Sequence, residues 1–188
     1  MKWRFALKFL ITFAALIVLW WQVDFGAIYT RIVLALAAVV SPLANGWLLE
    51  VAASGAAAFR RGTERMDLLI QLPALSMGLM PLLSLIVATP GQKPLLLARN
   101  LVLGIVLYIL IDVAIVLVYP YILDRPNTWK DTLGVFSGLV GFVVAPLGLW
   151  FVLTYSALRP IWQLVAVEME VDRSKRSVAP KRQGVRAR

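Results

Sequence analysis

The sequence predicts an all-α integral membrane protein with about four transmembrane helices, a small exterior β-hairpin-like segment and a disordered basic C-terminal tail. The 188 residues are 61% hydrophobic and only 15% charged, whereas soluble domains are near half apolar and a quarter charged. The apolar residues form continuous stretches, which favour helices over the alternating strands of a membrane barrel. The 19 Lys and Arg outnumber the 10 Asp and Glu and flank those stretches, as residues that set membrane orientation do.

Residues 1–23 begin with basic residues and continue as an apolar run, which resembles a secretory signal peptide. The run ends at Trp20 and Trp21 without the small residues of a cleavage site, so we expect an uncleaved signal-anchor helix. Three further stretches are long enough to cross roughly 30 Å of hydrocarbon at about 1.5 Å per helical residue. These predicted spans are residues 68–88, 101–122 and 133–158, within a membrane bundle of residues 67–160.

Residues 32–49 are apolar enough for a fifth span, but a Ser-Pro and an Asn-Gly pair interrupt them. Positive charge favours four spans, because a fifth would move the basic tail to the side opposite the basic N-terminus. The four-span arrangement predicts a multi-pass protein of the bacterial inner membrane, with both termini cytoplasmic and residues 24–66 outside. Whether residues 32–49 cross the membrane stays open in the sequence.

The exterior segment divides into two parts. Residues 27–40 are expected to form a helix that lies on the membrane surface or packs against the spans. Turn signals at Ser54-Gly55 and Gly62-Thr63 separate short runs and favour a β-hairpin or three-stranded ribbon over residues 47–72. The alternative is a helix over residues 47–59, because Ala and Leu favour helix.

The C-terminal segment, residues 161–188, is expected to form a short interfacial element followed by a disordered basic tail. Its basic side chains would bind anionic lipid at the cytoplasmic face of the bilayer, and nucleic acid is not an expected partner. The lipid-binding candidates are Arg173, Lys175, Arg176, Lys181 and Arg182.

Asp112 lies near the centre of the apolar run GIVLYILIDVAIVLVYP, residues 104–120. An ionised acid there costs about 2.5 to 3.5 kcal/mol on insertion scales, and no Lys or Arg lies at comparable depth in another span. We therefore expect Asp112 to be neutral and hydrogen-bonded within the bundle. Docking to a polar residue of another membrane protein and a role in proton or ion relay are the alternatives. The candidate hydrogen-bond partners are Tyr108, Ser76, Ser84, Ser137 and Thr154.

Small residues indicate where helices would pack closely. Gly134 and Gly138 form a GxxxG pair, and Gly78 follows an alanine by four residues. Pro81 and Pro146 are expected to kink the second and fourth predicted spans and to open a space between them.

The sequence contains no cysteine and no histidine. These absences exclude thiol nucleophiles, disulfides, a histidine base and the usual zinc ligands. No nucleophile–base pair or metal cluster can be assembled from the remaining residues, so we expect no metal, no cofactor and no enzymatic activity.

The passage SMGLMPLLSLIVATPGQKPLLLARNLVLGIVLYILIDVAIVLVYP, residues 76–120, has a characteristic order. An apolar span with Gly-Leu and Pro is followed by Ala-Thr-Pro, a short basic loop, and a Gly-containing span with a polar residue about two turns later. This order resembles exosortase-type membrane proteins, and in particular the small accessory proteins associated with exosortase H. Exosortases act through Cys, Arg and His, and this chain lacks Cys and His, so the resemblance implies a non-catalytic helper.

We therefore predict a non-enzymatic inner-membrane accessory protein that contacts another integral membrane protein, in exosortase-type protein sorting or envelope assembly. The alternative is a small transport component or substrate-binding subunit, with Asp112 in a site between kinked helices.

Overall fold

The computed structural model describes residues 2–43, 46–52, 57–67, 77–123 and 127–159. Most of them are helical, and a small three-stranded sheet interrupts the helices. The helix that starts at Thr128 passes through one π-helical turn, η2, and continues as α-helix to Arg159. In chain order the elements are α1 (Lys2–Val23), α2 (Phe25–Val40), the 3₁₀ turn η1 (Ser41–Leu43), β1 (Leu48–Val51), β2 (Ala57–Arg61), β3 (Glu64–Asp67), α4 (Leu79–Ala88), α5 (Pro94–Leu123), α6 (Thr128–Leu139) and η2 (Val140–Val144).

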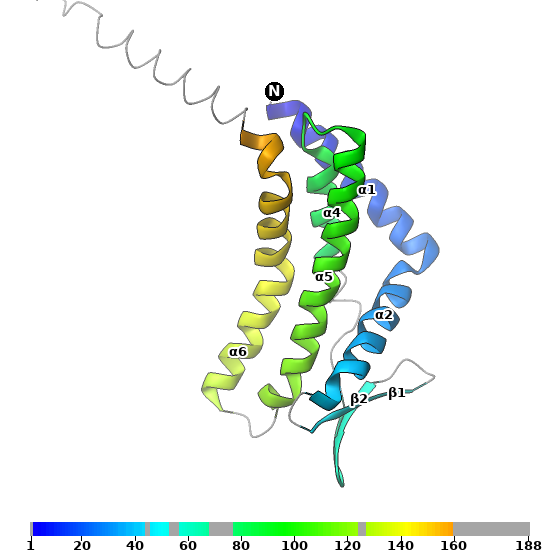
Figure 1. Cartoon of the computed structure of the whole chain (residues 1–188), viewed down its shortest axis with the longest axis vertical. Helices are drawn as coiled ribbons and strands as arrows, with labels where there is room; N and C mark the ends of the chain where they lie inside the picture. Colours follow the sequence, from blue (N-terminus) through cyan, green and yellow to red (C-terminus); the bar gives the residue numbers. More distant parts are fainter. Residues whose placement is uncertain (1, 44–45, 53–56, 68–76, 124–126, 160–188) are drawn as a thin grey trace, which may run out of the picture.

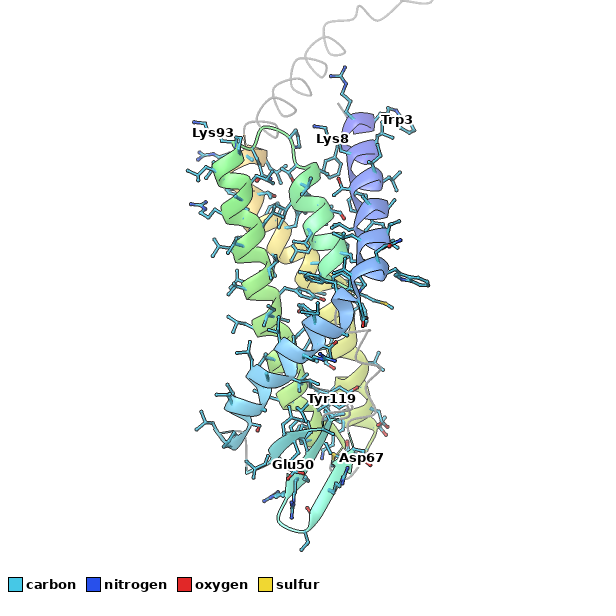
Figure 2. The ribbon with its side chains drawn as sticks, turned by 90° about the vertical axis from the view of Figure 1, so that its right-hand side faces the viewer. Trp3, Lys8, Glu50, Asp67, Lys93 and Tyr119 are labelled. Carbon is cyan, nitrogen blue, oxygen red and sulfur yellow. The ribbon has the colours of Figure 1, made fainter. Side chains whose placement is uncertain are left out.

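The helices form an elongated bundle with the sheet at one end (Figure 1). Helices α1 and α2 follow each other from the N-terminal end toward the sheet, and α5 runs the full length of the bundle. Lys8 and Lys93 lie at the N-terminal end, whereas Glu50 and Asp67 lie at the opposite end (Figure 2). The bundle thus separates a basic end from the end that carries the sheet.

Four helices are long and apolar enough to cross a membrane: Trp3–Val23, Phe25–Leu43, Pro94–Ile122 and Thr128–Arg159. The number of such helices agrees with the four predicted spans. The helices are not the same four, because Phe25–Leu43 is included and the predicted span 68–88 is not. The open segment, residues 32–49, contributes to the second long helix, because its Ser-Pro pair falls in the closing turn η1 and not inside the helix. The described part of the predicted span 68–88 is α4, whose ten residues extend only about 15 Å.

A single residue, Asp24, separates α1 from α2. Its φ of 49° and ψ of 39° are left-handed, a conformation that Asp tolerates better than most side chains. Aromatic packing holds the bend, since the Trp20 ring centroid lies 4.8 Å from Phe25 and 6.5 Å from Tyr29. As a result α2 bends toward α5 and packs against it (Figure 1), which is one of the two predicted placements.

The strands confirm the three-stranded ribbon, one of the two strand arrangements predicted for residues 47–72, of which residues 53–56 and 68–72 lie outside the described residues. The sheet has the order β1-β2-β3, and both strand pairs are antiparallel. Gly62, with a φ of 60°, and Thr63 form a two-residue turn between β2 and β3, where such a φ favours glycine. The helical alternative for residues 47–59 is wrong for the described residues, which form β1 and the start of β2.

The hydrophobic core runs from the helices into the sheet. Leu49 and Phe59 are buried on the sheet face that meets the bundle, and they share one cluster with residues of α2, α4 and α5. The helical members of that cluster include Val33, Leu34, Ala37, Leu79, Leu82, Ile86, Val113 and Val116.

Candidate functional site: a buried polar centre between α2, α5 and η2

Asp112 lies in the second half of α5 and is fully buried, at 0% exposure. The Tyr29 hydroxyl of α2 donates a hydrogen bond of 2.6 Å to Asp112 Oδ2. Tyr29 begins the buried stripe of α2, which continues at Val33 and Ala37; this four-residue spacing marks one helix face. The stripe packs on α5 and so brings the tyrosine to the acid.

The second carboxyl oxygen, Asp112 Oδ1, is buried without a hydrogen-bond partner among the residues that the structure describes. The expected interhelical hydrogen bond is therefore present on one oxygen only. That Asp112 is neutral stays a prediction.

Tyr108, one turn before Asp112, is not its donor. The Tyr108 hydroxyl donates to the Gly141 carbonyl oxygen at 2.9 Å, and a hydroxyl has only one proton to give. The Tyr108 and Tyr29 rings pack against each other with centroids 6.5 Å apart. The two tyrosines therefore bind different acceptors at one junction of helices.

The Gly141 carbonyl needs a donor because of the local backbone. In a regular α-helix it would accept the Ala145 N–H, but in η2 that N–H bonds to the Val140 carbonyl instead. The next backbone donor in a π-helical turn would be residue 146, which is proline and has no N–H. The Tyr108 hydroxyl supplies the missing hydrogen bond.

Gly78 borders the same junction. A Cβ added at Gly78 would overlap the Tyr108 hydroxyl and lie 2.7 Å from the Gly141 carbonyl oxygen. Gly78 was predicted to allow close packing, and the groups that approach it closely are the Tyr108 side chain and the Gly141 carbonyl. The GxxxG pair differs, because a Cβ at Gly134 would meet only Ile122 at 3.6 Å and one at Gly138 would meet nothing within 4 Å.

The described hydroxyl groups of Ser84, Ser137 and Thr154, predicted as partners of Asp112, donate instead to backbone carbonyls of their own helices. Ser84 donates to the Met80 carbonyl at 2.7 Å, Ser137 to the Gly134 carbonyl at 2.8 Å, and Thr154 to the Trp150 carbonyl at 2.7 Å. Such bonds satisfy a buried hydroxyl within its own helix, so it needs no partner on a neighbouring helix. Ser76 and the tail candidates Arg173, Lys175, Arg176, Lys181 and Arg182 lie outside the described residues.

Sequence reasoning missed Tyr29 and Gly141. A tyrosine inside an apolar stretch, followed by Val33 and Ala37 at four-residue steps, was the available signal for Tyr29. Gly141 had no comparable signal beyond its position five residues before Pro146.

The chemistry of this centre is hydrogen bonding between helices. Among the described residues no three His, Cys, Asp or Glu side chains gather as a metal site would require. Fold and site together define a helical membrane protein with a buried Tyr–Asp contact. No family model matches the chain, and no curated protein or solved structure matches it.

Proposed function

We propose that this chain is a non-enzymatic membrane accessory protein that acts by contact with another integral membrane protein. The three-stranded sheet is the contacting part, on the exterior side of a bacterial inner membrane, and both termini are cytoplasmic. A sorting or envelope-assembly system of the exosortase type is the setting that the resemblance of residues 76–120 supports.

The observation that carries this proposal is the attachment of the sheet to the bundle. Phe59 and Leu49 are only 1% and 6% exposed, and they belong to the core cluster of α2 and α5. The Leu49 N–H also donates to Ser41 Oγ at 3.0 Å, which ties β1 to the end of α2. A sheet held in this way presents its other face in a fixed orientation, as a contact surface requires.

The outer face of the sheet is charged. Arg60 pairs with Glu50 at 3.3 Å and Arg65 with Asp67 at 3.1 Å, and all four side chains are more than half exposed. Exposed pairs of this kind add little to stability. They fit a role in the orientation and specificity of a contact better than a role in folding.

The alternative, a transport or substrate-binding subunit that uses Asp112, has less support. Asp112 is fully buried and already bound by Tyr29, and the Tyr108 ring fills the junction beside it. A substrate would have to displace side chains that bury Asp112 to reach the acid.

Affinity purification of the full chain from native membranes in mild detergent tests the proposal. We expect a stoichiometric integral membrane protein to co-purify with the wild type and to be lost from the double variant Glu50→Ala, Arg60→Ala. The matched control is Lys130→Ala with Asp131→Ala, which also removes one charge of each sign but lies at the start of α6. The proposal fails if the wild type purifies alone, or if the sheet variant retains the partner as the control does.

A further inference from the structure

The two edges of the sheet differ in how they are covered. The outer edge of β1 faces η1, where the Leu49 N–H donates away from β2 to Ser41 Oγ. The chain therefore covers this edge itself, as proteins do to prevent unwanted strand pairing.

The register of β2 and β3 shows which backbone groups of β3 point away from the sheet. Arg61 and Glu64 flank the two-residue turn, and the residues that flank such a turn exchange backbone hydrogen bonds. Hydrogen-bonded and non-hydrogen-bonded pairs alternate, so Met66 also bonds toward β2, whereas Arg65 and Asp67 direct their N–H and C=O groups outward. We call these outward groups the β3 edge.

No described residue hydrogen-bonds the backbone of the β3 edge. The strand is also accessible, since Glu64, Arg65 and Asp67 are exposed and Met66 is partly buried. The β2–β3 hairpin points away from the helices (Figures 1 and 2). Edge groups that no described residue pairs are a template for another extended chain.

Charge indicates which residue such a chain would carry. Arg60 of β2 lies directly opposite Arg65 of β3, and like charges in this arrangement repel. Leu48, Arg60 and Arg65 thus lie side by side on neighbouring strands, and a fourth strand would place its own residue next to Arg65. Each arginine already contacts one exposed carboxylate, Glu50 or Asp67. A carboxylate at that place on the fourth strand would be a second partner for Arg65 and would further reduce the repulsion.

We propose that the β3 edge binds an extended segment of a partner protein as a fourth strand, with an acidic residue of that segment opposite Arg65. Backbone groups supply affinity and the acid supplies register, as in other cases of strand addition. This inference rests on the proposed accessory function and names the contact through which the partner is held.

The test uses the full chain in lipid nanodiscs and a fluorescent peptide, Thr-Val-Thr-Glu-Thr-Val-Thr, whose binding is followed by anisotropy. We expect saturable binding that weakens at least tenfold when Lys replaces the peptide Glu. Arg65→Pro removes one outward N–H without touching the ladder to β2 and is tolerated on an edge, so it should abolish binding. Arg65→Ser keeps the N–H and should bind both peptides equally.

Several results would overturn the inference. The inference fails if binding does not saturate or if Arg65→Pro binds like the wild type. It also fails if the Arg65 and Asp67 amides exchange slowly without peptide, because slow exchange would show that the edge is already covered. If Arg65→Pro instead converts a dimer into a monomer, the occupant is a second copy of this chain. If the native partner co-purifies equally with wild type and Arg65→Pro, the contact lies elsewhere, and the accessory function stands without this inference.

Discussion

The Tyr29 hydroxyl and Asp112 Oδ2 lie 2.6 Å apart although 83 positions separate the residues in sequence. The contact joins the helix next to the sheet to the long helix that runs through the whole bundle. Ser41 follows α2 directly and accepts a hydrogen bond from β1. The helix that carries Tyr29 therefore also leads into the residue that anchors the sheet.

Tyr29→Phe should destabilise the protein. The variant removes the only donor to Asp112 among the described residues, and a buried acceptor without a partner costs about 1–3 kcal/mol. Thermal unfolding in detergent measures the loss, with Tyr155→Phe, an exposed tyrosine, as the control. Equal melting temperatures for the two variants would contradict the expectation.

Asp112 and Tyr29 should show energetic coupling. Asp112→Leu leaves the Tyr29 hydroxyl without its acceptor, so the change should cost less in a Tyr29→Phe background, by about 0.5–3 kcal/mol. Chemical or thermal unfolding of the four proteins of this cycle gives the coupling. Additive effects would show that the hydrogen bond contributes no net stability.

Asp112→Asn distinguishes the structural role from a relay role. The amide oxygen can still accept from Tyr29, so assembly and partner retention should stay near wild type. Co-purification of the partner and the melting temperature are the two measurements. Loss of a transport activity with assembly intact would support the alternative function instead.

Gly78→Ala should be poorly tolerated. Its Cβ would overlap the Tyr108 hydroxyl and approach the Gly141 carbonyl oxygen to 2.7 Å, and overpacking of this kind costs about 1–3 kcal/mol. Gly138→Ala is the matched control, because its Cβ meets nothing within 4 Å. The expectation fails if both variants unfold at the same temperature.

The loss of stability caused by Tyr108→Phe should depend on whether residue 146 is proline. The phenylalanine leaves the Gly141 carbonyl without its donor, whereas Pro146→Ala restores a backbone N–H that can serve the π-helical turn. We expect Tyr108→Phe to cost about 1–3 kcal/mol alone and clearly less beside Pro146→Ala. The same loss in both backgrounds, measured by thermal unfolding, would contradict this account of Tyr108.

Cysteines test the orientation of the bundle, because the natural chain has none. Thr63→Cys in the hairpin turn and Lys93→Cys in the loop before α5 are both exposed, and we expect an impermeant maleimide to label them from opposite sides. Thr63 is preferred to its neighbour Gly62, whose positive φ disfavours a side chain. Labelling of both from one side would refute the proposed orientation.

Turn chemistry and the long helix α5 could be predicted because they depend on neighbours in sequence. The Gly62-Thr63 pair is a turn signal in the sequence alone, and it is the turn that joins β2 to β3. The predicted span 101–122 lies within α5, which starts earlier because Pro94 suits the first turn of a helix. The placement of α2 could not be predicted, since an apolar helix can lie on a membrane or pack against a bundle with the same pattern.

The sequence by itself determined a helical membrane protein with turn signals between short runs in residues 47–72 and an acid that requires a partner. Continuous apolar stretches, turn residues and the cost of a buried charge are local properties, and a single chain displays them directly. Only the tertiary structure decided that Tyr29 is that partner and that Tyr108 serves Gly141 instead. Those contacts depend on how α2, α5 and η2 cross in space, and the distance between side chains on different helices is not encoded in any one segment.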